Sequence, residues 1–417
     1  MNVPASGLHS NIQGRIADLG KVDILIGIPS FENEDTVGGV IEKVTRGVHQ
    51  HFPDKDAMVM LTDGNSRDDT RDQARQVTIP EGVKRVVTTY RGVSGKGSAF
   101  RAVFEAGSMM DVDACLVVDA DLRTEVDRWV KLHLTPIFQE DMDLMTPSYA
   151  RHKFDGTITN NVCFPMTGAL YGTEVRQPIG GDFGLSGDLV KYYAEQNDWD
   201  TDVARFGIDI WMTTTAINEG FSIGQTNLGA KIHDPKDPGE ALGPMFKQVV
   251  GTLFRMMKWY AKNWYSSDQV NTAPTFGPPL RIKPEPVPVD REGLRRRALA
   301  GWQLHKEDYQ RYLSDAQFEL LSEQFSNEGG EIWRGRITAN QWARILYDYS
   351  VSYNFETSDP DEMIATLIPL YFARTACLFD EMEGKQEEEA EAHIQSLVDV
   401  MLEEKSHLKD IWPEDLS

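Results

Sequence analysis

The chain has 417 residues and a formal net charge of −23 at pH 7, and hydrophobic residues make up 41% of it. This length predicts two domains, or one domain with a large appendage, and the hydrophobic content is ordinary for a globular protein with a full core. The strong acidity argues against a nucleic-acid partner and against docking on an anionic membrane, because both surfaces would repel the chain.

Cysteine usage and the N-terminus bear on the compartment. The three cysteines, Cys115, Cys163 and Cys377, are far apart and form no CxxC pair. They indicate neither a disulfide framework nor a zinc site, and they fit a reducing cytoplasm. Residues 1–20 lack the apolar stretch of a signal peptide, and no apolar run approaches the length of a membrane span. We therefore expect a cytoplasmic protein that does not enter a membrane.

The first half of the chain alternates short apolar runs with helical patterns. Strands are expected at residues 22–28, 57–61, 83–88, 114–118 and 143–147, and helices at residues 36–49, 67–77, 98–108 and 125–138. Strands that alternate with helices predict an α/β fold with a mainly parallel sheet and helices on both faces. In such sheets the ligand lies beyond the carboxyl ends of the strands, where the polar loops of this chain also fall.

The second half is organised differently. Residues 151–227 are glycine-rich and less regular, and we interpret them as the acceptor side of the ligand-binding cleft, whereas residues 242–265 have a helical pattern. The stretch after them is rich in prolines, namely Pro274, Pro278, Pro279, Pro284, Pro286 and Pro288. So many prolines exclude a helix or a central strand and predict a stiff linker. The expected parts are a catalytic domain at 1–270, a linker at 271–289 and an all-helical region at 290–417.

The strongest local motif is Asp119-Ala120-Asp121, directly after the fourth expected strand. Two carboxylates at a strand end can hold a divalent cation that also binds a diphosphate, because Mg²⁺ and Mn²⁺ prefer oxygen ligands. Such a cation helps a nucleotide to leave. Taken alone, the motif is equally consistent with a turn in which aspartate bonds to the backbone.

A second motif, Gly95-Lys96-Gly97, precedes the third expected helix. The glycines would let the backbone come close to a ligand, and Lys96 and the helix start would offer donors to a phosphate. The alternative is a helix entry with a solvated lysine. The pattern is not a Walker P-loop, because the spacing of the glycine and the residue after Lys96 do not match.

Two further single residues are candidates. His233 is a good ligand for Mn²⁺ and a tolerable one for Mg²⁺, although a lone histidine is more often structural. Asp209, in Phe206-Gly207-Ile208-Asp209, could hydrogen-bond sugar hydroxyls or assist a proton transfer. It could equally be a carboxylate that the helix dipole favours at a helix start.

Two polar stretches could meet a substrate. Arg151, Asp155 and Thr159 follow one another at four-residue spacing and would share one face if that stretch is helical. An arginine can pair with a carboxylate, and aspartate and threonine can bind hydroxyls, which are the groups of glycerate. The loop at 176–182 ends in Gly180-Gly181-Asp182 and indicates either close backbone approach to a substrate or a tight turn.

Together these motifs resemble the retaining GT-A glycosyltransferases that make glucosylglycerate, glucosyl-3-phosphoglycerate and mannosylglycerate. The matching stretches are residues 28–34, 63–66, 95–97, 119–121, 176–181, 206–209, 231–233 and 242–245. Each motif is modest alone, and their order and spacing over residues 22–257 make the match specific.

The resemblance implies roles for individual residues. Asp121 and His233 would bind the Mg²⁺ or Mn²⁺, with Asp121 and Asp209 as the catalytic pair and Asp209 facing the hexose. The residues assigned to the nucleotide sugar are Pro29, Glu32, Asp63, Lys96, Asp119, Gly181 and Asp182. Arg151, Asp155 and Thr159 would hold glycerate.

The chain departs from the family pattern at two places. It has Gly156-Thr157-Ile158-Thr159 where the phosphoglycerate enzymes have Gly-Arg-Val-Thr, so the arginine expected to meet the acceptor's phosphate is missing. Asp182 also stands where the family usually has a glutamate, which would shorten or remove a contact with a hydroxyl.

The implied reaction is transfer of glucose from a nucleoside diphosphate glucose to the 2-hydroxyl of D-glycerate, with retention of configuration. A mannosylglycerate synthase that uses GDP-mannose stays open, because these residues decide neither the sugar nor the base. A sugar nucleotidyltransferase is disfavoured by the acidic loop at 31–35, and a non-catalytic sugar-nucleotide-binding protein by the intact Asp-x-Asp, lysine and histidine. The C-terminal helices could cover the cleft or form a homodimer.

Overall fold

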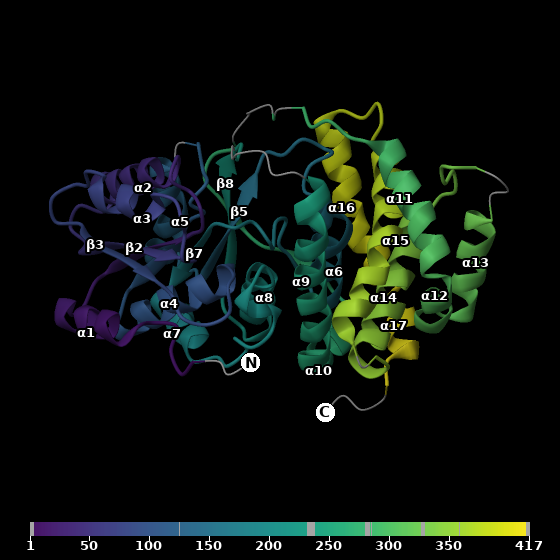
Figure 1. Cartoon of the computed structure of the whole chain (residues 1–417), viewed down its shortest axis with the longest axis horizontal. Helices are drawn as coiled ribbons and strands as arrows, with labels where there is room; N and C mark the ends of the chain where they lie inside the picture. The colour runs from purple at the N-terminus through teal and green to yellow at the C-terminus, as the bar shows by residue number, and fades with distance from the viewer. Residues whose placement is uncertain are drawn as a thin grey trace. The chain divides into compact units, whose positions relative to one another are not determined.

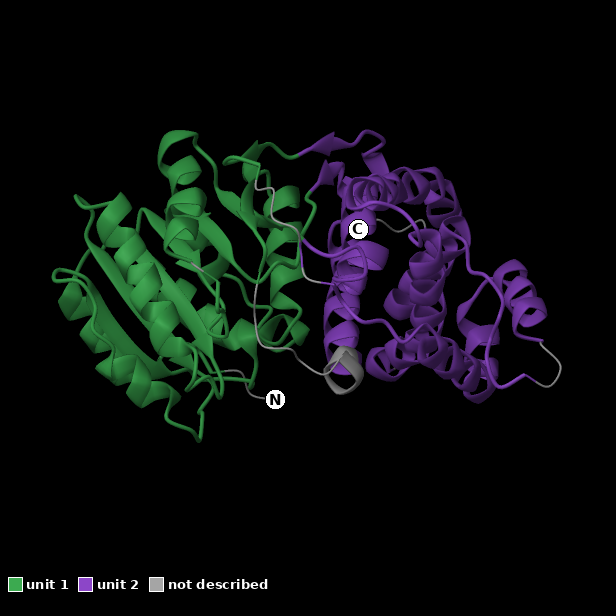
Figure 2. Ribbon diagram, turned by 90° about the horizontal axis from the view of Figure 1, so that it is seen from above, with its two compact units in different colours: residues 1–150, 175–237, 273–283 green, residues 151–174, 238–272, 284–417 purple. Residues whose placement is uncertain are grey.

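The computed structural model describes residues 4–124, 126–231, 238–279, 284, 286–326, 330–357 and 359–413. The chain divides into two compact units, which Figure 2 colours separately. Unit 1 comprises residues 1–150, 175–237 and 273–283, and unit 2 comprises residues 151–174, 238–272 and 284–417.

Unit 1 is built on an eight-stranded sheet with the order β10-β8-β5-β7-β4-β1-β2-β3. The strands are β1 (Ile24–Ser30), β2 (Ala57–Asp63), β3 (Lys84–Thr89), β4 (Ala114–Val117), β5 (Leu144–Tyr149), β7 (Phe183–Ser186), β8 (Ile223–Gly229) and β10 (Thr275–Phe276). All neighbours pair in parallel except β7, which is antiparallel to both β4 and β5. The predicted α/β fold with a mainly parallel sheet is confirmed.

Helices cover both faces of this sheet (Figure 1). One face carries α2 (Val37–His51), α3 (Thr70–Gln76) and α5 (Asp127–Gln139), and the other carries α1 (Ser10–Leu19), α4 (Lys96–Met109) and α7 (Gly187–Ala194). The short η2 (Asp202–Ala204) and α8 (Ile208–Asn218) follow α7 in the chain.

Side chains of β1 alternate between the two faces. Ile24, Ile26 and Ile28 belong to one buried cluster together with residues of α2 and α5. The residue between them, Gly27, points the other way, where a β-carbon would lie 2.5 Å from the side chain of Val103 in α4. Because successive strand residues face opposite sides, this central strand is buried on both faces and reads as a continuous apolar run.

The expected strands and helices of the first half are all present, with ends shifted by at most three residues. The sequence did not predict β7. It is only four residues long, and its apolar character is partly hidden by Gly180 and Gly181 before it and Gly184 within it.

Unit 2 is mainly helical. Its helices are η1 (Thr159–Cys163), α6 (Phe164–Tyr171), α9 (Pro238–Trp259), α10 (Ala261–Ser266), α11 (Arg291–Leu304), α12 (Lys306–Tyr312), α13 (Asp315–Phe325), α14 (Ala339–Phe355), α15 (Pro360–Glu381), α16 (Glu387–Glu403) and α17 (Lys405–Ile411). A two-residue parallel pairing joins β6 (Thr173–Glu174) to β9 (Asn271–Thr272). The expected helical character of the C-terminal region is confirmed.

The compact units do not follow the expected boundaries at 270 and 289. Residues 151–174 and 238–272 belong to unit 2, because α6 packs against α16 and α9 packs against α14 and α15. The stretch 271–289, expected to be a stiff linker without a helix or central strand, contains the short strands β9 and β10. Proline is tolerated here because β10 is an edge strand and Pro274 only has to supply its carbonyl, which accepts from the N–H of Gln225.

Helix α15 differs from the expectation that no apolar run approaches the length of a membrane span. By length and composition it is the one helix among the described residues that could cross a membrane, with a mean hydropathy of 1.3 over an 18-residue window. However, 78% of that window is buried inside the protein, and α15 packs against α11, α9 and α14. A core helix passes the same test, so α15 is weak evidence for a membrane span.

Candidate functional site

Six side chains from separate segments of unit 1 meet at the carboxyl edge of the sheet. Asp119 follows β4, Tyr149 ends β5, Lys231 follows β8, Lys96 begins α4 and Asp209 lies in the first turn of α8. Asp182 immediately precedes β7. Because β7 runs antiparallel to β4, with Phe183 opposite Val117, the start of β7 lies at the same edge as the end of β4. Ligands of open α/β sheets bind at this edge.

Asp119 lies between two ammonium groups. Its Oδ1 is 2.9 Å from the Nζ of Lys96, and its Oδ2 is 2.8 Å from the Nζ of Lys231. Its backbone N–H donates to the Oδ1 of Asp182 over 2.9 Å. Burial alone would raise the pKa of Asp119, but the charges of Lys231 and Lys96 outweigh it and hold that pKa well below its usual range. Asp119 is therefore ionised.

Asp182 is fully buried behind Asp119. Its Oδ2 accepts from the Nζ of Lys231 over 2.8 Å and also from the hydroxyl of Tyr149. Burial raises the pKa of Asp182, the charge of Asp119 adds to the increase, and Lys231 opposes it. Both carboxylate oxygens of Asp182 thus have partners inside the protein.

Asp209 is paired with Lys96. Its Oδ1 lies 3.3 Å from the Nζ of Lys96, and only 8% of the residue is exposed. Burial raises the pKa of Asp209, while the ammonium of Lys96 opposes the increase. Burial would lower the pKa of Lys96, but the charges of Asp119 and Asp209 together raise it. The cluster therefore joins three carboxyl groups to two lysine ammonium groups.

The glycines of Gly95-Lys96-Gly97 lie close to the backbone of residues 203–205. A β-carbon on Gly97 would lie 1.8 Å from the carbonyl oxygen of Val203, and one on Gly95 would lie 2.6 Å from that of Ala204. The backbone N–H of Gly97 donates to the carbonyl of Arg205. The glycines thus have a packing role: they let the start of α4 lie against η2, which leads into α8.

Gly181 has a comparable role beside Asp119. Its φ of +90° favours glycine, and a β-carbon there would lie 2.4 Å from the Oδ2 of Asp119 and 3.0 Å from the Nζ of Lys231. The missing side chain therefore leaves space for the contact between these two groups.

The loops after β1 and β2 are tied together by Asp63. This aspartate is 1% exposed and accepts from the hydroxyls of Ser30 and Ser66 and from the N–H of Ser66, and its Oδ1 lies 3.5 Å from the Nε of Arg71. The hydroxyl of Ser66 in turn accepts from the N–H of Glu32. The carboxylate of Asp63, expected to meet the nucleotide, is thus already engaged in fixing the two loops.

The other residues expected near the base differ in exposure. Pro29 lies within β1 and is half-buried, whereas Glu32 is exposed in the loop that follows. Glu32 has a φ of +54° and Asn65, in the loop after β2, a φ of +69°. Both are left-handed conformations that non-glycine residues rarely adopt, and such residues cluster at binding sites.

The expected metal site is described only in part. Asp121 is half-buried two residues after Asp119, and His233 lies outside the described residues. Within the described part of the chain, no group of three or more His, Cys, Asp or Glu side chains could hold a metal ion. Mg²⁺ bound to a diphosphate, however, needs only one or two carboxylates from protein and takes its other oxygens from phosphate and water. The carboxylate of Asp121 fits such an ion, whereas both oxygens of Asp119 already contact lysine ammonium groups.

The residues expected to hold the acceptor belong to unit 2. Arg151 and Asp155 form an ion pair, with 3.1 Å between Nη1 and Oδ2, and Thr159 begins η1 and is buried. Residues 151–156 form a turn, so the expectation of one helical face is wrong. Gly156, with a φ of +64°, reverses the chain there, and a β-carbon on it would lie within 4 Å of both Arg151 and Thr159. The three residues are thus neighbours through a turn.

Comparison with known proteins found a family match in the first half of the chain. Residues 25–178, which include most of the sheet of unit 1 and residues 151–174 of unit 2, match the family model described as glycosyl transferase family 2. The predicted resemblance and the predicted glycosyltransferase class are confirmed.

The chain is also similar to glucosyl-3-phosphoglycerate synthases. It is 24% identical over 261 residues to a glucosyl-3-phosphoglycerate synthase of Mycolicibacterium paratuberculosis, and the matched region covers 55% of this chain and 71% of the relative. The glucosyl-3-phosphoglycerate synthase of Mycobacterium tuberculosis, solved with Mg²⁺ and uridine diphosphate, is 24% identical, with a TM-score of 0.44 and coverage of 58% of this chain and 83% of that one. Another crystal structure of that enzyme, with Mn²⁺, UDP-glucose and phosphoglyceric acid, is 22% identical, with a TM-score of 0.44 and coverage of 61% and 85%.

Two residues of the lysine–carboxylate cluster were not singled out in the sequence. Lys231 lies in a stretch that was matched to the family, but only its neighbour His233 received a role. Tyr149 ends an apolar strand and gives no polar signal of its own. Their contacts with Asp182 connect β5, β7 and β8, which are far apart in the chain. A short stretch of sequence contains no pattern that predicts such contacts.

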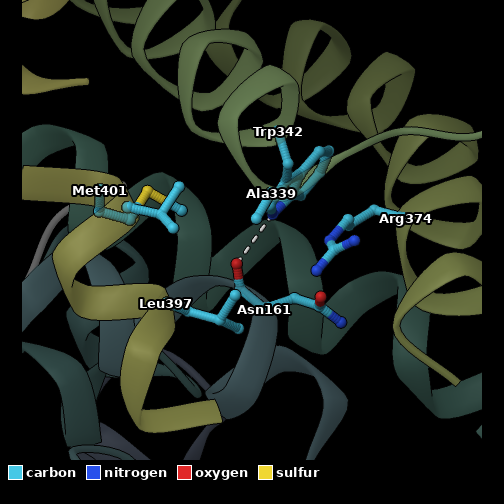
Figure 3. Close-up of a pocket in the computed structure, with 7 residues that line it drawn as sticks. Asn161, Ala339, Trp342, Arg374, Leu397 and Met401 are labelled. Atoms are coloured by element: carbon cyan, nitrogen blue, oxygen red, sulfur yellow. Dashed lines mark hydrogen bonds between the residues drawn. The ribbon is translucent and has the colours of Figure 1, made fainter. Parts of the chain in front are cut away.

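A small cavity lies elsewhere, inside unit 2 (Figure 3). It is lined by Asn161, Ala339, Trp342, Arg374, Leu397, Val400 and Met401. The indole N–H of Trp342 donates to the carbonyl of Asn161 over 2.8 Å, which Figure 3 marks with a dashed line. The cavity contains none of the residues of the lysine–carboxylate cluster or of the expected acceptor site.

Proposed function

We propose that this glycosyltransferase moves glucose from a nucleoside diphosphate glucose to the 2-hydroxyl of D-glycerate, with retention of the anomeric configuration. The observation that carries the proposal is the convergence of Lys96, Asp119 and Asp209, with an ammonium 2.9 Å from one carboxylate and 3.3 Å from the other. Lys96 offers its ammonium to the diphosphate, and Asp209 accepts hydrogen bonds from hexose hydroxyls.

The proposed donor site includes the loops after β1 and β2. Pro29 and Glu32 would bind base and ribose, Asp119 the ribose, and Asp63 would act by holding the two loops together. The curated relative is a glucosyl-3-phosphoglycerate synthase, which supports glucose as the sugar. UDP-glucose, present in one of the solved relatives, is therefore the first donor to test.

A divalent cation is part of the proposal. Asp121, with His233, would hold Mg²⁺ or Mn²⁺, and the bound cation would neutralise negative charge on the departing diphosphate. The preference of Mg²⁺ and Mn²⁺ for carboxylate oxygens supports Asp121 as a ligand.

The proposed acceptor residues are Arg151, Asp155 and Thr159, with the guanidinium of Arg151 pairing with the carboxylate of glycerate. Thr157 supports an unphosphorylated acceptor. It stands where the phosphoglycerate enzymes have an arginine, and its hydroxyl lies 2.5 Å from that of Tyr371. This position therefore offers no guanidinium to a phosphate.

In the proposed reaction, the 2-hydroxyl oxygen of glycerate forms a bond to the anomeric carbon on the face from which the diphosphate leaves. The bond between that carbon and the diphosphate oxygen breaks, and the leaving phosphate takes the proton of the hydroxyl. The transition state has oxocarbenium character. Lys96 stabilises charge on the leaving group, and Asp209 orients the hexose. The buried, free cysteines support a reducing, cytoplasmic compartment for this protein.

The decisive experiment is a matrix of UDP-, GDP- and ADP-glucose and GDP-mannose against D-glycerate, 3-phosphoglycerate and lactate, with Mg²⁺, Mn²⁺ or EDTA. We expect hexosylglycerate as the main product, with the nucleoside diphosphate released in equal amount. Preference for GDP-mannose would favour mannosylglycerate synthesis instead. Release of pyrophosphate from a nucleoside triphosphate and a sugar phosphate, without hexose transfer, would refute the proposal in favour of nucleotidyl transfer.

The metal site has its own test. Asp121→Ala should abolish transfer and also remove the calorimetric signal of Mn²⁺ binding in the presence of the nucleoside diphosphate. Full activity of this variant in EDTA would refute the role of Asp121.

A further inference from the structure

Lys231 fills the space between two carboxylates. Its Nζ lies 2.8 Å from the Oδ2 of Asp119, 2.8 Å from the Oδ2 of Asp182 and 3.1 Å from the carbonyl oxygen of Gly180. A lysine ammonium has three N–H donors, so these three contacts use its whole capacity. A ligand would gain a hydrogen bond from Lys231 only if one of them broke.

Lys96 is held differently. Only its contact with Asp119, at 2.9 Å, is short, and the distances to the carboxylate of Asp209 and to the carbonyl of Gly181 are both 3.3 Å. Its side chain is 14% exposed, against 9% for Lys231. Lys96 can therefore turn toward a phosphate at small cost, whereas Lys231 is enclosed by protein partners.

Asp182 and Tyr149 complete the enclosure of Lys231. Asp182 accepts from the backbone N–H of Asp119 with one oxygen and from Lys231 and the hydroxyl of Tyr149 with the other. The Nζ of Lys231 also lies 5.3 Å from the centre of the Tyr149 ring, a distance typical of a cation–π contact. Asp119 is thus held twice, through its backbone by Asp182 and through its side chain by Lys231.

We propose that Lys231, Asp182 and Tyr149 are positioning residues that orient the carboxylate of Asp119 for the nucleotide without touching the nucleotide themselves. One oxygen of Asp119 is fixed by Lys231 on the inner side, which directs the other oxygen toward Lys96. The inference rests on the proposed function, because it takes Asp119 as a contact of the donor. It assigns Asp182 to the support of Asp119 and not to a hydroxyl of the sugar.

A double-mutant cycle on the full chain separates support from direct contact. The dissociation constant of UDP in the presence of Mn²⁺ is measured by calorimetry for the wild type, Lys231→Met, Asp119→Asn and the double variant. We expect each single change to weaken binding by about tenfold, because each removes a hydrogen bond between charged groups. The double variant should bind within about twofold of Asp119→Asn, since both changes act through the same carboxylate.

Two outcomes would overturn the positioning role. Losses that multiply in the double variant would mean that Lys231 contacts the nucleotide directly, and unchanged binding by Lys231→Met would mean that Asp119 needs no support. Lys231→Arg should restore part of the affinity, because a guanidinium can bridge two carboxylates.

Loss of folding in Lys231→Met, detected by circular dichroism, would call for Asp182→Asn in the same cycle. Asparagine keeps an oxygen that can accept from the N–H of Asp119 but loses the charge that holds Lys231. Asp182→Asn should therefore weaken UDP binding by about tenfold, and its double variant with Asp119→Asn should bind UDP within about twofold of Asp119→Asn.

Hexose transfer by the wild type is measured separately from UDP binding. A wild type that binds UDP but transfers no hexose would refute the proposed function and leave the positioning result to stand, whereas a wild type that binds no UDP would overturn both.

Discussion

The ammonium of Lys96 lies 3.3 Å from the carboxylate of Asp209, although the two residues are 113 positions apart in the chain. The first turn of α4 carries the lysine and the first turn of α8 carries the aspartate. They meet because Gly95 and Gly97 have no side chains to keep α4 away from residues 203–205. Close backbone packing thus sets the distance between two charged groups of the site.

Replacement of Lys96 tests the electrostatic centre of the cluster. Lys96→Met should lower kcat/KM for transfer by about a hundredfold or more, because it removes a positive charge aimed at the leaving diphosphate. Steady-state kinetics with the preferred donor measure the loss, and Lys96→Arg should recover part of it. A kcat/KM of Lys96→Met within about threefold of the wild type would contradict this role.

Gly97→Ala tests the packing that brings the two helix starts together. The added β-carbon would lie 1.8 Å from the carbonyl oxygen of Val203, so the backbone must shift. We expect a loss of about 2 kcal/mol in the free energy of unfolding, together with lower activity, because the distance between Lys96 and Asp209 changes. Chemical denaturation followed by circular dichroism measures the loss.

Gly14→Ala is the matched control for this change. Gly14 lies within helix α1 and has no atom within 4 Å of an added β-carbon. Alanine there should stabilise the protein by about 0.5–1 kcal/mol through helix propensity. Equal effects of the two substitutions would show that the close approach of Gly97 to Val203 is unimportant.

Arg151→Gln tests the proposed acceptor residues. Loss of the guanidinium should raise the KM for D-glycerate by about tenfold or more, since a charged hydrogen bond to the carboxylate disappears. The KM for the donor should stay the same, because the residues assigned to the donor are unchanged. A rise in the donor KM with an unchanged acceptor KM would exclude Arg151 from acceptor binding.

Glu381 in unit 2 makes stability depend on pH. Burial would raise its pKa, but hydrogen bonds from His393 and Arg374 lower the pKa of Glu381 from its usual 4.5 to about 2. Because the folded state binds the proton less readily, this carboxylate stabilises the protein above pH 4.5, and the contribution is lost as the pH falls toward 2. At pH 7 the free energy of unfolding of the wild type should exceed that of Glu381→Gln by about 2 kcal/mol. This difference should shrink as the pH falls.

Urea denaturation at several pH values measures this difference. Glu319→Gln, at an exposed position in α13, serves as the control and should show little change at any pH. A gap between wild type and Glu381→Gln that stayed constant from pH 7 to pH 3 would contradict the assigned role of the Arg374–Glu381 pair.

Much of the fold of unit 1 could be predicted because the apolar patterns of its helices and strands lie within short stretches of sequence. The apolar face of α2, with Val37, Val40, Ile41, Val44 and Val48, is present in the sequence and is buried as expected. The alternation of such helices with apolar strands was sufficient for the fold class. The edge strand β10 was not predicted, and residues 151–156 form a turn where a helix was considered. Pairing with β8 and the ion pair between Arg151 and Asp155 are contacts that local composition does not contain.

The sequence by itself determined which chemical groups the protein has and roughly where the strands that carry them end, since apolar periodicity and the positions of Asp119, Lys96 and Asp209 are properties of short windows. Only the tertiary structure decided which of these groups form ion pairs with one another. The antiparallel entry of β7 and the return of the chain after β8 bring Asp182 and Lys231 to Asp119, and such contacts depend on strand order and not on any neighbouring residue.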